Sequence, residues 1–304
     1  MKHTPVIIID DVKGQEDSWL EKRRGMLTAS ELPIATGLMP RICTPMQLWA
    51  RKMGIEPEPS LNDAMFLGLE LEPIVAKMVT RHTGEELKPV NRFYGLKEVP
   101  WIGATPDYEN LDGTKIFQLK TSSSHAAQYW QDGIPDYAHI QVQVEMGCTG
   151  IHKGAVAALV GGRDFYIYDT EFNEDVFAQI LSIGEKFMEC IKSQTPPIPY
   201  AEDAGLINKL LDRSGLSPDV AELPDSALTL VERYEVAKAQ ETALNQQAKV
   251  FEAERKAIEL QLRQVMGDCR EGRIAGRILK QSRCVIPARS QAEVVYYRFS
   301  VKED

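Results

Sequence analysis

WIGATPDYENLDGTKIFQLKTSSS, residues 101–124, has the pattern of two strands joined by a turn. Short apolar segments flank Asp112-Gly113, a dipeptide that favours the tight turn of a β-hairpin. Asp107 follows the first segment, and Lys120 lies at the end of the second. This stretch therefore predicts an aspartate and a lysine held close together on neighbouring strands.

This pairing of an acid with a lysine suits the metal-assisted hydrolysis of a phosphodiester. Mg²⁺ prefers hard oxygen ligands and neutralises phosphate oxygens, while a nearby lysine can orient the attacking water. Gln118 and Lys120 leave a strand on the same face, whereas Leu119 points into the core and can offer its carbonyl oxygen to the metal. The plainer alternative is a turn aspartate at Asp107 and an edge-strand lysine at Lys120.

Glu72 is a candidate for a further acid. It lies in a helix predicted over residues 63–83, and its neighbours on one helical face are Gly68, Leu69, Val75, Ala76 and Val79. A carboxylate in such a stripe is costly unless it is paired or bound to a metal. Pro73 implies a helix start or a kink, so the alternative is that Glu72 caps the first turn of a helix.

The remaining pattern predicts a mixed α/β fold with a helical extension. Thr28-Ala29-Ser30-Glu31 has the form of a capping box, which predicts a helix start near Thr28. Other elements are predicted as helices over 135–148 and 174–193 and as strands over 89–96, 101–105, 115–120, 153–160 and 164–170. The proline cluster at 195–199 predicts a boundary between a first domain, 1–200, and a second, 201–304.

The second domain contains a long helix with one apolar seam. Its seam residues recur every seven positions: Leu230, Ala237, Leu244, Phe251, Ile258 and Val265. We favour an α-hairpin that packs on its own chain over an intermolecular coiled coil. Residues 273–287 and 293–302 are expected to form a closing strand pair.

Composition argues against several classes of protein. The five cysteines (Cys43, Cys148, Cys190, Cys269, Cys284) form no CxxC pair and the histidines lack ligand spacing, which argues against zinc and iron–sulfur sites and fits a reducing cytoplasm. No run is long enough for a membrane span. The net charge of −9 alone argues against nucleic acid, yet residues 263–302 hold nine Lys and Arg against three acids, and metal-dependent nucleases need carboxylates.

Five blocks, in order, resemble one nuclease family over about residues 17–200. They are RRGMLTAS (23–30), GLELE with HTG (68–72 and 82–84), GATPD (103–107), QLK (118–120) and IQVQVEMGCTG (140–150). Together they are similar to the YqaJ-type viral recombinase, or phage lambda exonuclease, family of the PD-(D/E)xK nuclease superfamily. The resemblance implies a restriction-endonuclease-like core, in which a central mixed β-sheet is flanked by helices.

The resemblance also implies catalytic roles for single residues. Asp107 would be the central metal ligand, Glu72 an additional acid and Lys120 the catalytic lysine. Gln118 stands at the position of the family's second acidic ligand, and Gln141 matches a glutamine of the site wall. The implied cofactor is Mg²⁺, for which Mn²⁺ is expected to substitute.

A second group of residues matches a pocket for the 5′-phosphate of the digested strand. Arg23 and Ser30 match positions that hold this phosphate, and Thr105 matches a hydroxyl residue near it. Arg24 could take the place of Arg23, because the two are adjacent. An arginine and hydroxyls at a helix N-terminus form a natural anion site, although Ser30 could equally cap that helix.

Two positions depart from the family's pattern. Gln118 offers an amide oxygen but no charge, so metal binding should be weaker, and we expect faster hydrolysis in Mn²⁺ than in Mg²⁺. A tyrosine common three residues before the site glutamine is replaced by Ala138, with Tyr137 one position away.

The function expected from the resemblance is that of a Mg²⁺-dependent deoxyribonuclease. It would digest linear double-stranded DNA from 5′ to 3′ and leave a single strand for phage-type recombination, in the cytoplasm. The resemblance implies a homo-oligomeric ring and a single-strand annealing protein as partner. Two alternatives remain: a catalytically weakened DNA-binding or scaffold module, favoured by Gln118, and an endonuclease on the same fold.

Overall fold

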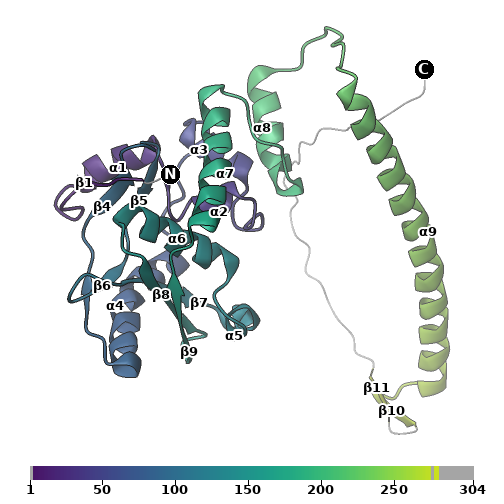
Figure 1. Cartoon of the computed structure of the whole chain (residues 1–304). Helices are drawn as coiled ribbons and strands as arrows, with labels where there is room; N and C mark the ends of the chain where they lie inside the picture. The colour runs from purple at the N-terminus through teal and green to yellow at the C-terminus, as the bar shows by residue number, and fades with distance from the viewer. Residues whose placement is uncertain (1–2, 275–276, 281–304) are drawn as a thin grey trace. The chain divides into compact units, whose positions relative to one another are not determined.

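Two mixed β-sheets organise the first part of the chain (Figure 1) in the computed structural model, which describes residues 3–274 and 277–280. The described chain divides into two units between residues 209 and 210. In the described ranges, no helix has the length and apolar character needed to cross a membrane.

The five-stranded sheet of the first unit has the order β3-β6-β7-β8-β9. Its strands are β3 (Leu87–Pro89), β6 (Tyr108–Asn110), β7 (Ile116–Ser122), β8 (Lys153–Val160) and β9 (Asp164–Glu171). β7 and β8 run parallel with Gln118 opposite Val156, and the other neighbours are antiparallel. The expected turn at Asp112-Gly113 joins β6 to β7, with Gly113 at φ 70°. The strand expected over 101–105 as the hairpin partner is β5 (Ile102–Ala104) of the other sheet, so that pairing is wrong and the unpredicted β6 takes its place.

The four-stranded sheet has the order β1-β4-β5-β2. Its strands are β1 (Pro5–Ile9), β4 (Phe93–Leu96), β5 (Ile102–Ala104) and β2 (Leu27–Thr28). β2 lies parallel to β5, and the other pairs are antiparallel. The sequence predicted one strand over 89–96, which is wrong, because β3 and β4 in that region belong to different sheets.

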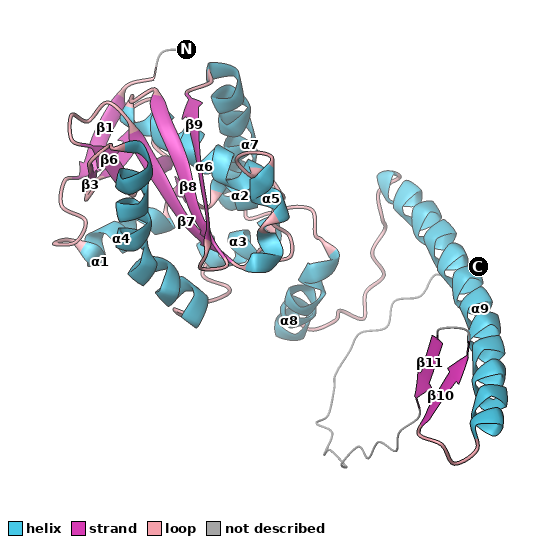
Figure 2. Cartoon of the chain, turned by 90° about the horizontal axis from the view of Figure 1, so that it is seen from below, coloured by secondary structure: helices cyan, strands magenta, loops and turns pink. Residues whose placement is uncertain are grey.

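Helices cover both faces of the five-stranded sheet, with α4 on one face and α6 on the other (Figure 2). The helices that precede α9 (Ser226–Met266) are α1 (Glu16–Arg24), α2 (Leu32–Ala35), α3 (Pro45–Lys52), α4 (Asp63–Thr83), α5 (Gln128–Gln131), α6 (Asp136–Thr149), α7 (Glu174–Lys192) and α8 (Ala204–Ser214). Short 3₁₀ turns span Ser124–Ala126 and Ala201–Asp203. The expected central mixed sheet flanked by helices is confirmed.

The two faces of β7 alternate as a buried strand requires. Phe117 and Leu119 pack in a core with Val75 of α4, while Ile116 packs in another core with Val142 of α6. Successive side chains of a strand point to opposite faces, so Gln118 and Lys120 share the α6 side. The expectation that Leu119 points into the core is confirmed, since the residue is 6% exposed.

α4 confirms the helix predicted over 63–83. The Asn62 side chain caps its start by accepting from Met65 N at 2.9 Å, and Gly84 ends it in the left-handed conformation at φ 77°. Pro73 lies inside the helix, so Glu72 is in its middle. The alternative that Glu72 caps a first turn is therefore wrong.

The helix start predicted near Thr28 is also wrong. Thr28 belongs to β2, because Leu27 N and Ala29 N donate to carbonyls of Trp101 and Gly103 and hold this segment extended. Thr28 N does donate to Glu31 Oε2 at 2.9 Å, as a capping box would. The contact closes a turn, and α2 begins only at Leu32.

The second unit contains the long helix α9 (Ser226–Met266) and a hairpin of β10 (Glu271–Ile274) and β11 (Arg277–Lys280). Leu244 and Phe251 on the predicted seam are 65% and 68% exposed, so in the described part of this unit no second helix covers them. The α-hairpin expected from the sequence is therefore not formed within the described part of the second unit. The expected strand at 293–302 lies outside the described residues.

Candidate active site

A cleft of about 840 Å³ lies where the chain passes between its two sheets. One crossing joins β3 to β4 and the other joins β5 to β6, and Val90 N donates to Asp107 O between them at 3.0 Å. The lining of the cleft includes nearly every site residue predicted from the sequence: Arg23, Ser30, Glu72, Thr105, Asp107, Gln118, Leu119, Lys120 and Gln141. Arg24 is not among its lining residues in the described chain.

Asp107 and Gln118 are directly bonded at the centre of the cleft. Asp107 Oδ2 accepts from Gln118 Nε2 at 2.5 Å and from Leu119 N at 2.7 Å. The short β6–β7 connection and the antiparallel pairing fix this contact, because Tyr108 lies opposite Phe117. Gln118 is 2% exposed, so its amide is oriented entirely by its protein partners.

Gln141 of α6 ties together three other polar side chains of the cleft. Its Oε1 accepts from Lys120 Nζ at 2.7 Å. Its Nε2 donates to Gln118 Oε1 at 2.9 Å and to Glu145 Oε1 at 3.0 Å. Lys120 is therefore positioned by α6, and an unbroken chain of hydrogen bonds runs from Asp107 to Glu145.

The carboxyl groups of the cleft are perturbed by burial and by one another. Burial, together with the charge of Asp107, raises the pKa of Glu72 to about 7. Burial raises the pKa of Asp107, against the opposing effects of Lys120 and the Leu119 N–H. Burial and the nearby Asp107 charge raise the pKa of Glu145 well above its usual range. Clustered perturbed acids in a cleft are typical of functional sites.

Lys52, whose side chain is buried, holds the backbone of the segment that carries Arg23. Lys52 of α3 donates to the carbonyls of Arg23 and Met26 at 2.8 and 2.6 Å and to Glu31 at 2.8 Å. Arg23 lies over the Trp19 ring, with its guanidinium carbon 4.6 Å from the ring centroid. The structure thus distinguishes Arg23, which lines the cleft, from the adjacent Arg24, which does not.

The hydroxyl residues of the predicted phosphate pocket also line the cleft. Ser30 Oγ lies 3.1 Å from Thr28 Oγ1 and does not cap a helix, since α2 has no side-chain cap. Because α2 has only four residues, its dipole adds little, and a phosphate here would depend on side chains. Thr105 lies on the second crossing, two residues before Asp107.

The donor chemistry of the cleft fits a hard divalent cation. No group of three or more His, Cys, Asp or Glu among the described residues is arranged to hold a metal ion. The set at hand is mixed, with the Asp107 carboxylate, the Gln118 amide oxygen and the Leu119 carbonyl. Buried Glu145 Oε2 has no hydrogen-bond partner in the described structure, which is unfavourable for a buried polar atom that binds no ligand.

Sequence reasoning missed Glu145 and Lys13. Glu145 lies one helical turn after Gln141, so the i,i+4 spacing could have identified it once residues 135–148 were assigned to a helix. Lys13, which lowers the pKa of Glu72, comes from the N-terminal segment and carried no local signal. Its backbone N–H donates to Asn91 at 2.9 Å, which fastens that segment to the first crossing.

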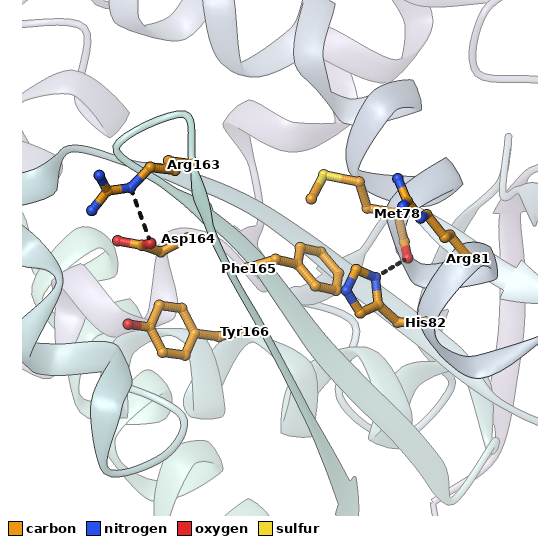
Figure 3. A pocket seen from close by; sticks show the side chains of 7 residues that line it. All are labelled: Met78, Arg81, His82, Arg163, Asp164, Phe165 and Tyr166. Carbon is orange, nitrogen blue, oxygen red and sulfur yellow. Dashed lines mark hydrogen bonds and ion pairs between the residues drawn. The ribbon is translucent and has the colours of Figure 1, made fainter.

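A smaller hollow of about 530 Å³ lies between α4 and β9 (Figure 3). His82 stacks on Phe165 with ring centroids 4.6 Å apart and donates from Nδ1 to Met78 O at 2.8 Å. Arg163 pairs with Asp164 at 3.4 Å. Since its single acid is already paired, this hollow lacks the clustered carboxylates of the larger cleft.

Comparisons with known proteins cover most of the part of the chain that forms the cleft. Residues 18–152 match the family model of the YqaJ-like viral recombinase domain. The chain is 27% identical over 242 residues to YqaJ of Bacillus subtilis (strain 168), described as an uncharacterized protein, and covers 76% of it with 78% of its own length. The resemblance predicted from the sequence blocks is therefore confirmed.

Two solved exonucleases are similar to part of the chain. The alkaline exonuclease LHK-Exo of Laribacter hongkongensis is 18% identical, with 66% of this chain and 100% of that one covered and a TM-score of 0.48. A phage-related exonuclease of Haemophilus somnus 129PT is 14% identical, with 56% and 96% covered and a TM-score of 0.42.

Proposed function

We propose, from the match of residues 18–152 to the viral recombinase domain, that this chain is a metal-dependent exonuclease. It degrades one strand of linear double-stranded DNA from the 5′ end and leaves the other strand for recombination. The observation that carries this proposal is the convergence of Glu72, Asp107, Gln118, Lys120 and Gln141 on one cleft.

The cofactor proposed is Mg²⁺, with Mn²⁺ able to substitute. Bound in the cleft, it would neutralise phosphate oxygens and lower the pKa of a coordinated water. Asp107, the Gln118 amide oxygen and the Leu119 carbonyl would hold it, with Glu72 as a further acid. Lys120, held by Gln141 at 2.7 Å, would orient the attacking water and offset charge on the phosphate.

Arg23, Ser30 and Thr105 would select DNA ends. These side chains line the same cleft as the acids, and a guanidinium with hydroxyls is suited to a phosphate. A terminal phosphate occurs only at an end, so such a pocket favours an exonuclease over an endonuclease. We further propose that the protein works as a homo-oligomeric ring in the cytoplasm, beside a single-strand annealing protein.

The test is digestion by purified protein with Mg²⁺ or Mn²⁺. Three substrates are compared: linear 5′-phosphorylated duplex, linear 5′-hydroxyl duplex and closed circular duplex, with strand-specific end labels to report direction. We expect fastest loss of the 5′-phosphorylated strand, survival of the circle and no digestion by Lys120→Ala. Rates should be higher in Mn²⁺, because a neutral amide ligand suits it better.

Other outcomes would redirect the assignment. Nicking of the circle at a rate similar to that of linear DNA would indicate an endonuclease. Binding of DNA without cleavage in either metal would favour the catalytically weakened binding or scaffold module. The observation behind that alternative is Gln118, which brings no charge to the metal. Digestion by Lys120→Ala at the wild-type rate would show that Lys120 is not needed for hydrolysis.

A further inference from the structure

Glu145 is a fully buried carboxylate with one oxygen unpaired. It lies on α6 and is 0% exposed. Its Oε1 accepts from Gln141 Nε2 at 3.0 Å, whereas Oε2 has no hydrogen-bond partner among the described residues. A buried charge without a compensating partner is strongly unfavourable, so such a group calls for a ligand or a proton.

Lys120 acts on Glu145 through its charge but forms no hydrogen bond or ion pair with it in the described structure. Lys120 lowers the pKa of Glu145 by its charge, but its ammonium donates to Gln141 Oε1 at 2.7 Å. The unpaired oxygen belongs to a residue that lines the cleft, so a cation can reach it from there.

Gln141 shows where such a cation would meet its ligands. Its single amide nitrogen donates to Gln118 Oε1 at 2.9 Å and to Glu145 Oε1 at 3.0 Å. These two oxygens, one from β7 and one from α6, therefore converge on one donor. Gln118 stands beside Asp107 and brings no charge, while Glu145 brings a charge that nothing else in the cleft uses.

We propose that Glu145 supplies the carboxylate that position 118 lacks. Asp107 and Glu145 give the divalent cation its negative ligands, and Gln118 adds a neutral amide oxygen. The second acidic ligand is thus on helix α6 and not on strand β7. This inference rests on the proposed function, because it assigns one more ligand to the same cation.

Cation binding by the full-length protein tests the proposal without DNA and without turnover. Isothermal titration with Mn²⁺ compares the wild type with Glu145→Gln, with the exchanged pair Gln118→Glu/Glu145→Gln, and with the control Glu70→Gln. Glu70 is an exposed glutamate of α4 and does not line the cleft. We expect at least about a tenfold weaker affinity for Glu145→Gln, recovery to within about threefold in the exchanged pair, and no change in the control.

The thermal midpoint in EDTA separates a ligand from a structural residue. Glu145→Gln should melt close to the wild-type temperature in EDTA, because one unpaired buried polar atom replaces another of the same size, while its stabilisation by Mn²⁺ should shrink. Wild-type Mn²⁺ affinity in Glu145→Gln, or no recovery in the exchanged pair, would overturn the proposal. So would a wild type that binds no Mn²⁺.

A second measurement needs no variant and covers the case in which Glu145→Gln fails to fold. Anomalous diffraction from wild-type crystals with Mn²⁺ should place the metal about 2.0–2.3 Å from a Glu145 oxygen. A metal held only by Asp107, Gln118 and Leu119 would overturn the assignment. DNA digestion is scored separately: digestion with unchanged Mn²⁺ affinity in Glu145→Gln defeats this inference alone, and Glu145-dependent Mn²⁺ affinity without digestion defeats the nuclease alone.

Discussion

Gln141 connects the lysine of the cleft to its acids, since one amide group contacts Lys120, Gln118 and Glu145. An amide suits this place because it accepts from an ammonium and donates to two oxygens at once. A carboxylate there would repel Glu145, and an apolar residue would leave three polar groups unpaired. The same side chain therefore serves both stability and the position of Lys120.

Substitution of two glutamines on α6 separates these effects. Gln141→Leu and Gln143→Leu should each cost about 1–3 kcal/mol of unfolding free energy, because each leaves buried polar groups unpaired. Gln143 donates to Glu171 O and accepts from Asn173 N, both at 2.9 Å, outside the cleft. Only Gln141→Leu should lower kcat for DNA digestion, by roughly tenfold or more. Similar losses of kcat in both variants would contradict this role.

Glu72 should give the metal-free protein a distinctive dependence of stability on pH. Burial and the Asp107 charge raise its pKa from the usual 4.5 to about 7, so the folded state binds this proton more tightly than the unfolded state. Its contribution to stability is present at low pH and is lost as pH rises from about 4.5 through about 7.

Urea unfolding in EDTA across this pH range measures the effect. Glu72→Gln should flatten the loss of stability between pH about 4.5 and about 7, relative to the wild type. Glu70→Gln, on the same helix but exposed, should leave it unchanged. Asp107 and Glu145 contribute with the same sign, so a residual slope is expected in Glu72→Gln. Parallel wild-type and Glu72→Gln profiles would refute the assignment.

The adjacent arginines Arg23 and Arg24 form a matched pair for the phosphate pocket. Arg23 lines the cleft beside Trp19, whereas Arg24 is exposed and is not among the lining residues of the described chain. Arg23→Ala should reduce the preference for 5′-phosphorylated over 5′-hydroxyl ends by about tenfold to a hundredfold, the value of one charge-assisted hydrogen bond. Arg24→Ala should retain the preference. The ratio of initial rates on the two ends measures it, and the reverse pattern would assign the phosphate to Arg24.

Most charged residues that line the cleft are among those named from the sequence, and two, Glu145 and Lys13, are not. Strand periodicity suffices to place Gln118 and Lys120 on one face, and the Asp112-Gly113 turn brings Asp107 near them, although the strand that pairs there is β6 and not the predicted 101–105. Glu145 was hidden because a helix that is buried nearly all round, as α6 is, shows no polar face to mark it. Glu145 is singled out by its unpaired Oε2, which can be recognised only once the packing around the side chain is known.

At the scale of elements, the cleft depends on how closely α6 packs against α7. Gly147 permits this approach, since a Cβ there would lie 2.5 Å from the Phe177 ring. Gly147→Ala should therefore destabilise the fold by about 1–3 kcal/mol through overpacking. Gly205→Ala is the control, because its Cβ would meet nothing within 4 Å and should stabilise slightly, as alanine does in helices. Chemical unfolding compares them, and a stable Gly147→Ala would show that α6 can shift.

The sequence predicted the long helices and strands well, but it did not predict which strands pair in which sheet. α4, α6, α7 and the β8–β9 pair follow from periodicity and from their glycine and asparagine ends. The two crossings between sheets could not be predicted, because strands as short as β3 and β6 have little pattern and the choice of sheet depends on tertiary pairing. The capping box at Thr28 failed likewise, since pairing of β2 with β5 overrides local preference.

At the scale of the whole molecule, the cleft belongs to one compact unit and the seam of α9 to another. All the residues that line the cleft lie within 12–145, so the chemistry proposed needs no side chain of the second unit. α9 is amphipathic without a partner helix in the described part of its unit, and a helix of this kind is stabilised mainly by packing of its apolar face. We predict that this seam contacts a second copy of the chain.

Self-association of the full-length chain should therefore depend on the seam. Leu244→Glu/Phe251→Glu replaces two exposed apolar side chains, each worth about 1.5–3 kcal/mol when buried, with charges that repel across a helix pair. We expect a smaller particle by light scattering coupled to size exclusion, with Mn²⁺ affinity unchanged, because the cleft is in the other unit. Gln246→Glu, two positions from Leu244 and off the seam, should retain the wild-type mass. A double variant of wild-type mass would mean that the ring proposed here closes through surfaces other than α9.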